Sequence, residues 1–139
     1  MKLIPYGKQY IDQDDIRSVS KVLKNEKITS GKEVTNFEKK ISQYLKCKFA
    51  HVCNSGTSAI FLALKSIDLK KDDIVIMPAI NFIASYNVAK FLGAKVFLAD
   101  VDKFTGQMTP DDVETCCKKF NIKKFKALIA MYHGGSPLN

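Results

Sequence analysis

The segment Ser55-Gly56-Thr57-Ser58 has the residue types and spacing of an anion-binding turn. It separates a short β-like run from a strongly apolar stretch, SAIFLALKSI, so the chain is expected to turn there from a strand into a helix. Such a turn points free backbone N–H groups and the positive end of the helix dipole at one place, where a phosphate fits. The alternative is an ordinary capped helix, in which Ser55 or Thr57 accepts from the first amides. The residues alone support both interpretations equally.

Phe82 is a second residue with potential chemistry. It stands where a loop that begins at Pro78 meets an expected helix. An aromatic side chain at such a junction can stack on a flat ring of a ligand. The spacing supports equally well a core aromatic at the start of an amphipathic helix.

The remaining polar candidates fit structural roles better. Asp100 and Asp102 resemble paired carboxylates, but they follow directly on an expected strand, where turn formation accounts for them. His133, which precedes two glycines, is interpreted as a hydrogen-bonded residue at a strand end rather than a catalytic base. His51 lies inside an expected strand without an acidic neighbour and is interpreted as structural.

The cysteines do not have the spacing of a zinc site or of a CxxC redox motif. We expect them to be reduced and mostly to serve as packing residues. They are Cys47, Cys53, Cys116 and Cys117.

Two helices are expected before any strand. Residues 12–24 carry an apolar stripe and have Asp12 as a capping residue. A polar stretch, NEKITSGK, leads to a second helix. Its apolar positions are Val34, Phe37, Ile41, Tyr44 and Leu45. Residues 1–46 are therefore predicted to form a helical lead-in.

From residue 47 onward, strand-like and helix-like patterns alternate. Strands are expected at residues 49–53, 74–77, 95–98 and 125–131. Helices are expected at residues 58–67, at about 82–92 with Gly93 as a left-handed cap, and after Thr109-Pro110. This alternation predicts βαβ units and a mostly parallel sheet flanked by helices. We expect one α/β domain over residues 1–139, with its βαβ core at residues 47–139.

Ligands of open α/β sheets bind beyond the carboxyl ends of the strands. The loops that follow Cys53, Met77, Leu98 and Met131 should therefore share one edge of the sheet. We therefore expect four segments to lie close together: residues 55–58, 80–82, 100–102 and 132–136.

Length and composition limit the classes of protein to which the chain can belong. A chain of 139 residues with 46% apolar and 26% charged residues suits one globular domain. The net charge of +8 comes almost entirely from lysine, and Arg17 is the only arginine. Because bidentate recognition of bases and phosphates favours arginine, this composition argues against a nucleic-acid-binding protein. No apolar run approaches the roughly 20 residues of a membrane span. We expect a cytoplasmic protein that binds neither nucleic acid nor membrane.

Taken together, these segments resemble the DegT/DnrJ/EryC1/StrS family of sugar aminotransferases, in order along nearly the whole chain. The opening IPYGKQYIDQDDI and the later KITSGKEVTNFEKKISQYL look like the family's start. HVCNSGTSAIFLAL resembles its phosphate loop and helix, and DDIVIMPAINFIASYNVAKFLGAKVFLADVD its second and third strands. TPDDVE and ALIAMYHGGSPLN continue the series.

The resemblance implies the N-terminal part of the large domain of fold-type-I enzymes that use pyridoxal 5'-phosphate. The turn at Ser55, with the amides of Gly56 and Thr57, would hold the cofactor phosphate, and Phe82 would stack on the pyridine ring. Tyr6 and Thr29 match segments on the substrate side. The resemblance implies no metal.

The resemblance also implies a reaction and partners. A relative of full length would transfer an amino group from glutamate to the 4-keto carbon of a UDP-linked deoxysugar, and would act as a homodimer. The IPYGKQYID opening and the GQMTP stretch look most like transaminases that make the 4-amino sugar precursor of pseudaminic acid. Several related keto-sugars stay open.

No lysine of the sequence matches the family's Schiff-base motif, which lies after the segment equivalent to Gly134-Gly135. The expectation is therefore a catalytically inactive polypeptide that is a fragment, one half of a split protein or a remnant. The second hypothesis is a module that binds phosphate or sugar nucleotides, or dimerises, without catalysis.

Overall fold

A computed structural model describes residues 7–24 and 27–135 of the chain. The chain divides into two compact units, Met1–Val52 and Cys53–Asn139. The boundary lies a few residues after position 47, where the alternation of strands and helices was expected to begin. None of the helices in the described ranges has the length and apolarity of a membrane span.

The first unit contains two helices, α1 (Gln13–Val22) and α2 (Lys32–Tyr44). Helix α1 begins after Asp12, as the sequence predicts, because the Asp12 carboxylate accepts from the Asp14 and Asp15 amides. The Asp15 carboxylate in turn accepts from the Asp12 amide at 3.0 Å, which completes a capping box. Neither helix fully buries a residue in the described part of the chain, so their apolar stripes are exposed or half-buried.

The strand expected at residues 49–53 does not form. No neighbouring strand offers a hydrogen-bonding edge there, and the Val52 amide instead donates to the Glu38 carboxylate of α2 at 3.0 Å. Both premises for His51 were wrong: it lies outside any strand, and its Nδ1 is 3.7 Å from a Glu38 oxygen. Its structural role stays a prediction. Glu38 lies 13 positions before His51 in the chain, so the residues next to His51 in the sequence do not reveal this contact.

The second unit is built on a parallel sheet of three strands in the order β2-β1-β3. The strands are β1 (Ile74–Pro78), β2 (Lys95–Ala99) and β3 (Ala127–Leu128). Strand β1 is central: Val75 pairs with Val96 on one side and with Ala127 on the other. Strand β3 is shorter than the run expected at 125–131, although amides on both sides of it still donate to carbonyls of β1.

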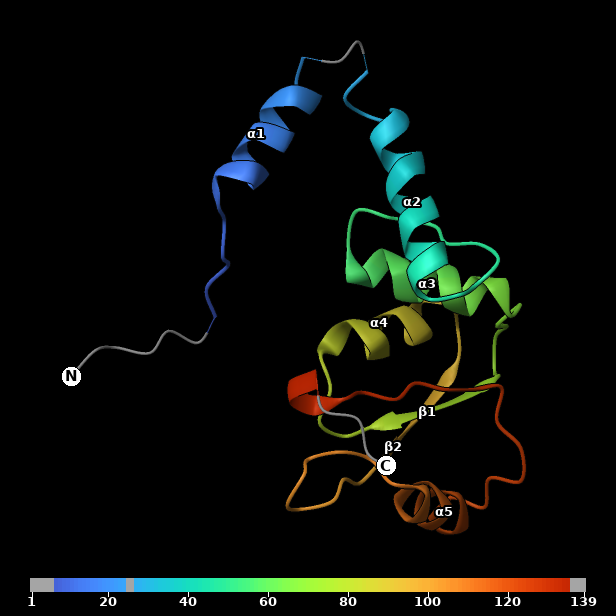
Figure 1. The fold of residues 1–139 in the computed structure, drawn as a ribbon. Helices are drawn as coiled ribbons and strands as arrows, with labels where there is room; N and C mark the ends of the chain where they lie inside the picture. The colour runs from blue at the N-terminus through green and yellow to red at the C-terminus, as the bar shows by residue number, and fades with distance from the viewer. Residues whose placement is uncertain (1–6, 25–26, 136–139) are drawn as a thin grey trace, which may run out of the picture. The chain divides into compact units, whose positions relative to one another are not determined.

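Helices cover both faces of this sheet. Helices α3 (Gly56–Ser66) and α4 (Ile83–Phe91) lie on one side of the strands in Figure 1, and α5 (Pro110–Lys119) lies on the other. Alternate residues of β1 serve the two faces: Val75 and Met77 pack with α3 and α4, whereas Ile76 packs against Cys116 of α5. This pattern explains why β1 reads as a continuous apolar run, which is typical of parallel strands buried on both faces.

Local signals fix the ends of the helices. Gly93 follows α4 with φ = 86°, as expected for a left-handed cap, and a Cβ there would stand 3.1 Å from the Cα of Lys71. Helix α5 begins with the predicted Thr109 cap and Pro110, and Asp112 completes a capping box with Thr109.

We predict that truncation of Ile76 strongly destabilises the second unit, because this side chain is 0% exposed and contacts the α5 side of the core. Ile76→Val should lower the free energy of unfolding by about 1 kcal/mol, and Ile76→Ala by roughly 2–5 kcal/mol. Urea denaturation followed by circular dichroism measures both. Ile83→Val is the matched control, since Ile83 is 58% exposed, and its effect should stay within about 0.5 kcal/mol. Equal losses at the two positions would contradict this account of the core.

Candidate functional site

The carboxyl ends of the three strands meet at one edge of the sheet, because the strands are parallel. At this edge the Ala79 amide, just after β1, donates to the Ala99 carbonyl at the end of β2 at 2.8 Å. The loop after β2 also reaches the turn η1 (His133–Gly135), since a Cβ at Gly106 would be 3.6 Å from the His133 ring. The expectation that these loops are neighbours is thus confirmed for the segments that follow β2 and β3.

The N-terminal ends of α3 and α4 lie on this same side of the second unit, at the left of Figure 1. The two helices also pack against each other. Ser55 to Ser58 and Phe82 therefore belong to the same edge, although no strand precedes Ser55 as the sequence suggested.

Ser55 is the N-cap of α3, and its hydroxyl accepts from the Ser58 amide at 3.2 Å. The Ser58 hydroxyl donates to the Asn54 side-chain oxygen at 2.7 Å, which fixes the turn. This cap uses the third amide of the helix and leaves the amides of Gly56 and Thr57 without an acceptor in the described chain. The capped-helix interpretation of the segment is confirmed, whereas anion binding stays a prediction for which two donors at the positive end of the helix are available.

Gly56 leaves space in front of these donors. An added Cβ would meet no atom within 4 Å, and both Gly56 and Thr57 are exposed. Because the backbone of Gly56 is not left-handed, a turn does not require glycine here. The open space in front of the amides would allow an anion to approach them closely.

Phe82 is the N-cap of α4, and its side chain is 71% exposed. The alternative of a core aromatic is therefore wrong for the described structure. The neighbouring Asn81 carries a buried side-chain amide nitrogen, Nδ2, that has no hydrogen-bond partner within the described residues. A buried donor without an acceptor costs free energy.

The structure does not test the two residues expected on the substrate side. Thr29 is exposed in a bend of the first unit. Tyr6 lies outside the described residues.

Asp102 forms a turn, as the sequence predicts. Its Oδ1 accepts from the amides of Phe104 and Thr105 and from the Thr105 hydroxyl. These hydrogen bonds from Thr105, and then that from Phe104, favour the charged form and hold the pKa of Asp102 below its ordinary value. The described residues contain no cluster of three His, Cys, Asp or Glu side chains that could hold a metal ion.

The cysteines are all free thiols, but only half of them pack as expected. Cys116 is buried and Cys117 is half-buried, whereas Cys47 and Cys53 are exposed. The two exposed thiols donate to nearby backbone carbonyls of the chain that follows them.

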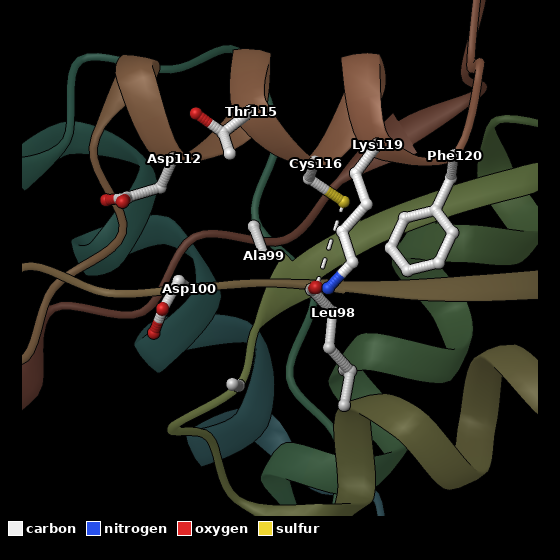
Figure 2. A pocket seen from close by; sticks show the side chains of 9 residues that line it. Leu98, Ala99, Asp100, Asp112, Thr115, Cys116, Lys119 and Phe120 are labelled. Carbon is white, nitrogen blue, oxygen red and sulfur yellow. Dashed lines mark hydrogen bonds between the residues drawn. The ribbon is translucent and has the colours of Figure 1, made fainter.

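A pocket that the sequence analysis missed lies on the α5 side of the sheet (Figure 2). It opens between the end of β2 and α5. The charged residues that line it are Asp100, directly after β2, and Asp112 and Lys119, about two turns apart on α5. Their spacing in the sequence matches no known motif. Only the packing of α5 against the end of β2 brings them together and forms the pocket.

Curated relatives and solved structures resemble this chain closely. Two UDP-4-amino-4,6-dideoxy-N-acetyl-beta-L-altrosamine transaminases of Campylobacter jejuni subsp. jejuni are 41% (strain 81-176) and 39% (strain NCTC 11168) identical over 99 residues. The matched segment covers 71% of this chain and 26% of each relative, so the chain spans about a quarter of their length.

Two solved structures share the fold. A DegT DnrJ EryC1 StrS aminotransferase from Brucella abortus is 27% identical, with a TM-score of 0.78 over 89% of this chain and 34% of that one. A protein of Streptococcus pneumoniae assigned as a sugar aminotransferase, in its pyridoxal phosphate form, is 29% identical, with a TM-score of 0.75 over 81% of this chain and 29% of that one. The second unit thus has the α/β fold of pyridoxal phosphate-dependent aminotransferases.

The family comparison agrees with the geometry of the turn before α3 and with the relatives. The matching family covers residues 9–139, nearly the whole chain. The chain belongs to the DegT/DnrJ/EryC1/StrS aminotransferase family.

Proposed function

We propose that this chain provides the phosphate- and ring-binding part of a pyridoxal 5'-phosphate site in a sugar-nucleotide aminotransferase. The observation that carries the proposal is the pair of unpaired amides at Gly56 and Thr57, at the open start of α3 and on the same edge as Phe82. When bound, the cofactor acts as the electron sink for the carbon that gains or loses the amino group.

Each residue of this edge has a separate part in binding. The amides of Gly56 and Thr57 donate to the phosphate, and the dipole of α3 adds roughly 1 kcal/mol for a negative charge at this end. Ser55 and Ser58 hold the turn in place through their mutual hydrogen bonds and Asn54. Ser55 thus acts on the phosphate by positioning the amides, because its hydroxyl donates to the Ser58 oxygen, whose own proton goes to Asn54.

Phe82 offers one face of its ring to the pyridine ring, since its side chain is largely exposed. An aromatic surface and polar donors at the edge of a parallel sheet fit a flat, phosphorylated molecule.

The substrate is proposed from the relatives. The Campylobacter jejuni transaminases are named for a UDP-linked 4-amino-4,6-dideoxy sugar. We infer that the family member containing this chain transfers an amino group, from glutamate, to the 4-keto carbon of a UDP-linked deoxysugar in pseudaminic acid biosynthesis. Tyr6 and Thr29 are proposed on the substrate side, and the enzyme is proposed to act as a homodimer.

We predict that Gly56→Pro weakens binding of pyridoxal phosphate to the 139-residue polypeptide about tenfold, because it removes one donor to the phosphate. Proline is tolerated at the first position of a helix, and the extended backbone of Ser55 is compatible with a following proline. Gly56→Ala is the matched control, since it keeps the N–H group. Fluorescence titration measures both, and equal weakening by Ala and Pro would show that the amide does not act.

A second prediction separates ring recognition from phosphate recognition. Phe82→Leu should weaken binding of pyridoxal phosphate about fivefold, because stacking contributes roughly 1 kcal/mol, and should leave binding of inorganic phosphate unchanged. Phe91→Leu makes the same change at an exposed phenylalanine at the other end of α4 and should alter neither. A parallel loss for both ligands in Phe82→Leu would assign Phe82 to the fold rather than to the ring.

The reaction itself is tested in a longer protein. We predict that the 139-residue polypeptide with cofactor, glutamate and a UDP-4-keto-deoxysugar yields no amino sugar, because none of its lysines matches the family's Schiff-base motif. A chimera in which residues 9–139 replace the aligned segment of a Campylobacter jejuni transaminase should yield the amino sugar, detected by mass spectrometry. Turnover by the short polypeptide, or a folded chimera that binds cofactor without turnover, would contradict the proposal.

A further inference from the structure

The pocket beside α5 has room for a small molecule. Its volume is about 250 Å³, and it lies between the carboxyl end of β2 and one face of α5. Pockets for drug-sized ligands begin at roughly 300 Å³, so an occupant must be smaller. None of the residues that line it belongs to the proposed cofactor site.

The floor of the pocket is neutral. Ala79 and Ala99 have only methyl groups there, which leaves the space open. The Cys116 thiol donates to the Leu98 carbonyl at 3.7 Å, and burial raises the pKa of this thiol above its ordinary value. Cys116 therefore stays protonated at neutral pH, and the charges of the pocket come from its ends.

One end carries two carboxylates, each with an oxygen still available. Asp100 uses Oδ1 to accept from the Val101 amide, which leaves Oδ2. Asp112 uses Oδ2 to accept from the Thr109 amide and hydroxyl, which leaves Oδ1. Beside them, the Thr115 hydroxyl has no hydrogen-bond partner within residues 27–135, although it lines the pocket.

The other end carries a cation. The Lys119 ammonium lies 5.5 Å from the centre of the Phe120 ring and makes no ion pair with any described residue. Figure 2 shows Asp100 and Asp112 together on one side of the pocket, and Lys119 with Phe120 on the other. Opposite charges thus line one small space without pairing with each other.

We infer that this pocket binds a small zwitterion that carries an ammonium group and a carboxylate. The ammonium would donate to Asp100 Oδ2, Asp112 Oδ1 and the Thr115 hydroxyl, which together provide the acceptors that such a group needs. The carboxylate would accept from the Lys119 ammonium. A molecule with only one of these charges can pair with the charged groups at only one end of the pocket. The pocket should therefore bind a zwitterion more tightly than a molecule with a single charge.

The test is a titration of the ¹⁵N-labelled 139-residue polypeptide, followed by NMR. The probes are glycine, 4-aminobutyrate and 6-aminohexanoate, which space the two charges differently, and ethylamine and propionate, which carry one charge each. At equal ionic strength, at least one zwitterion should shift the amide signals of Asp100, Thr115 and Lys119 in a saturable manner. It should bind at least about fivefold more tightly than ethylamine or propionate, because a charge-assisted hydrogen bond is lost with either group.

Variants assign the contacts. Asp100→Asn and Lys119→Met should each weaken the preferred zwitterion about fivefold or more. Lys118→Met is the matched control: it removes the same charge from the neighbouring position of α5, but Lys118 pairs with Glu114 at 2.7 Å and does not line the pocket. Asp112 is left unchanged, because it also completes the capping box of α5.

Three results would overturn the inference. The first is the absence of a saturable shift with any zwitterion. The second is equal binding of a probe with a single charge. The third is a loss in Lys118→Met as large as that in Lys119→Met, which would reduce the effect to the general charge of the helix.

Discussion

The second unit depends on the burial of one strand. Val75, Ile76 and Met77 follow one another in β1, and none is more than 1% exposed. A strand points successive side chains to opposite faces, so complete burial requires cover on both sides. Helices α3 and α4 supply one cover and α5 the other. The same requirement places the helix N-termini and the loops after the strands at one edge, where the candidate sites lie.

Much of this arrangement could be predicted from the sequence, because its signals are local. The Thr109-Pro110 start of α5 and the left-handed Gly93 were visible as residue types at fixed positions. The apolar run of β1 needed no tertiary information either, since a strand covered on both faces has no polar side. The helix cap at Ser55 was likewise recognised, whereas anion binding by the same turn stays a prediction.

The errors arose where structure depends on distant partners. Residues 49–53 have a strand-like pattern, but a strand forms only beside another, and Val52 bonds to Glu38 instead. The position of Phe82 could not be settled by periodicity, because a helix start can point an aromatic ring inward or outward. The α5 pocket had no sequence signal at all, since its charged residues come from separate elements. Sequence pattern therefore identifies the framework, whereas contacts between elements decide which polar groups stay available.

The hydrogen bond from the Ala79 amide to the Ala99 carbonyl joins the ends of β1 and β2. Both residues also line the α5 pocket, and the chain continues from Ala79 through Asn81 and Phe82 into α4. A ligand bound at Phe82 and a ligand bound in the pocket would therefore both lie close to the same pair of strand ends. Thermodynamic linkage makes any such coupling reciprocal: whatever factor occupancy of the pocket imposes on the affinity at Phe82, occupancy at Phe82 imposes on the pocket. A single backbone contact would then make the two faces one allosteric unit.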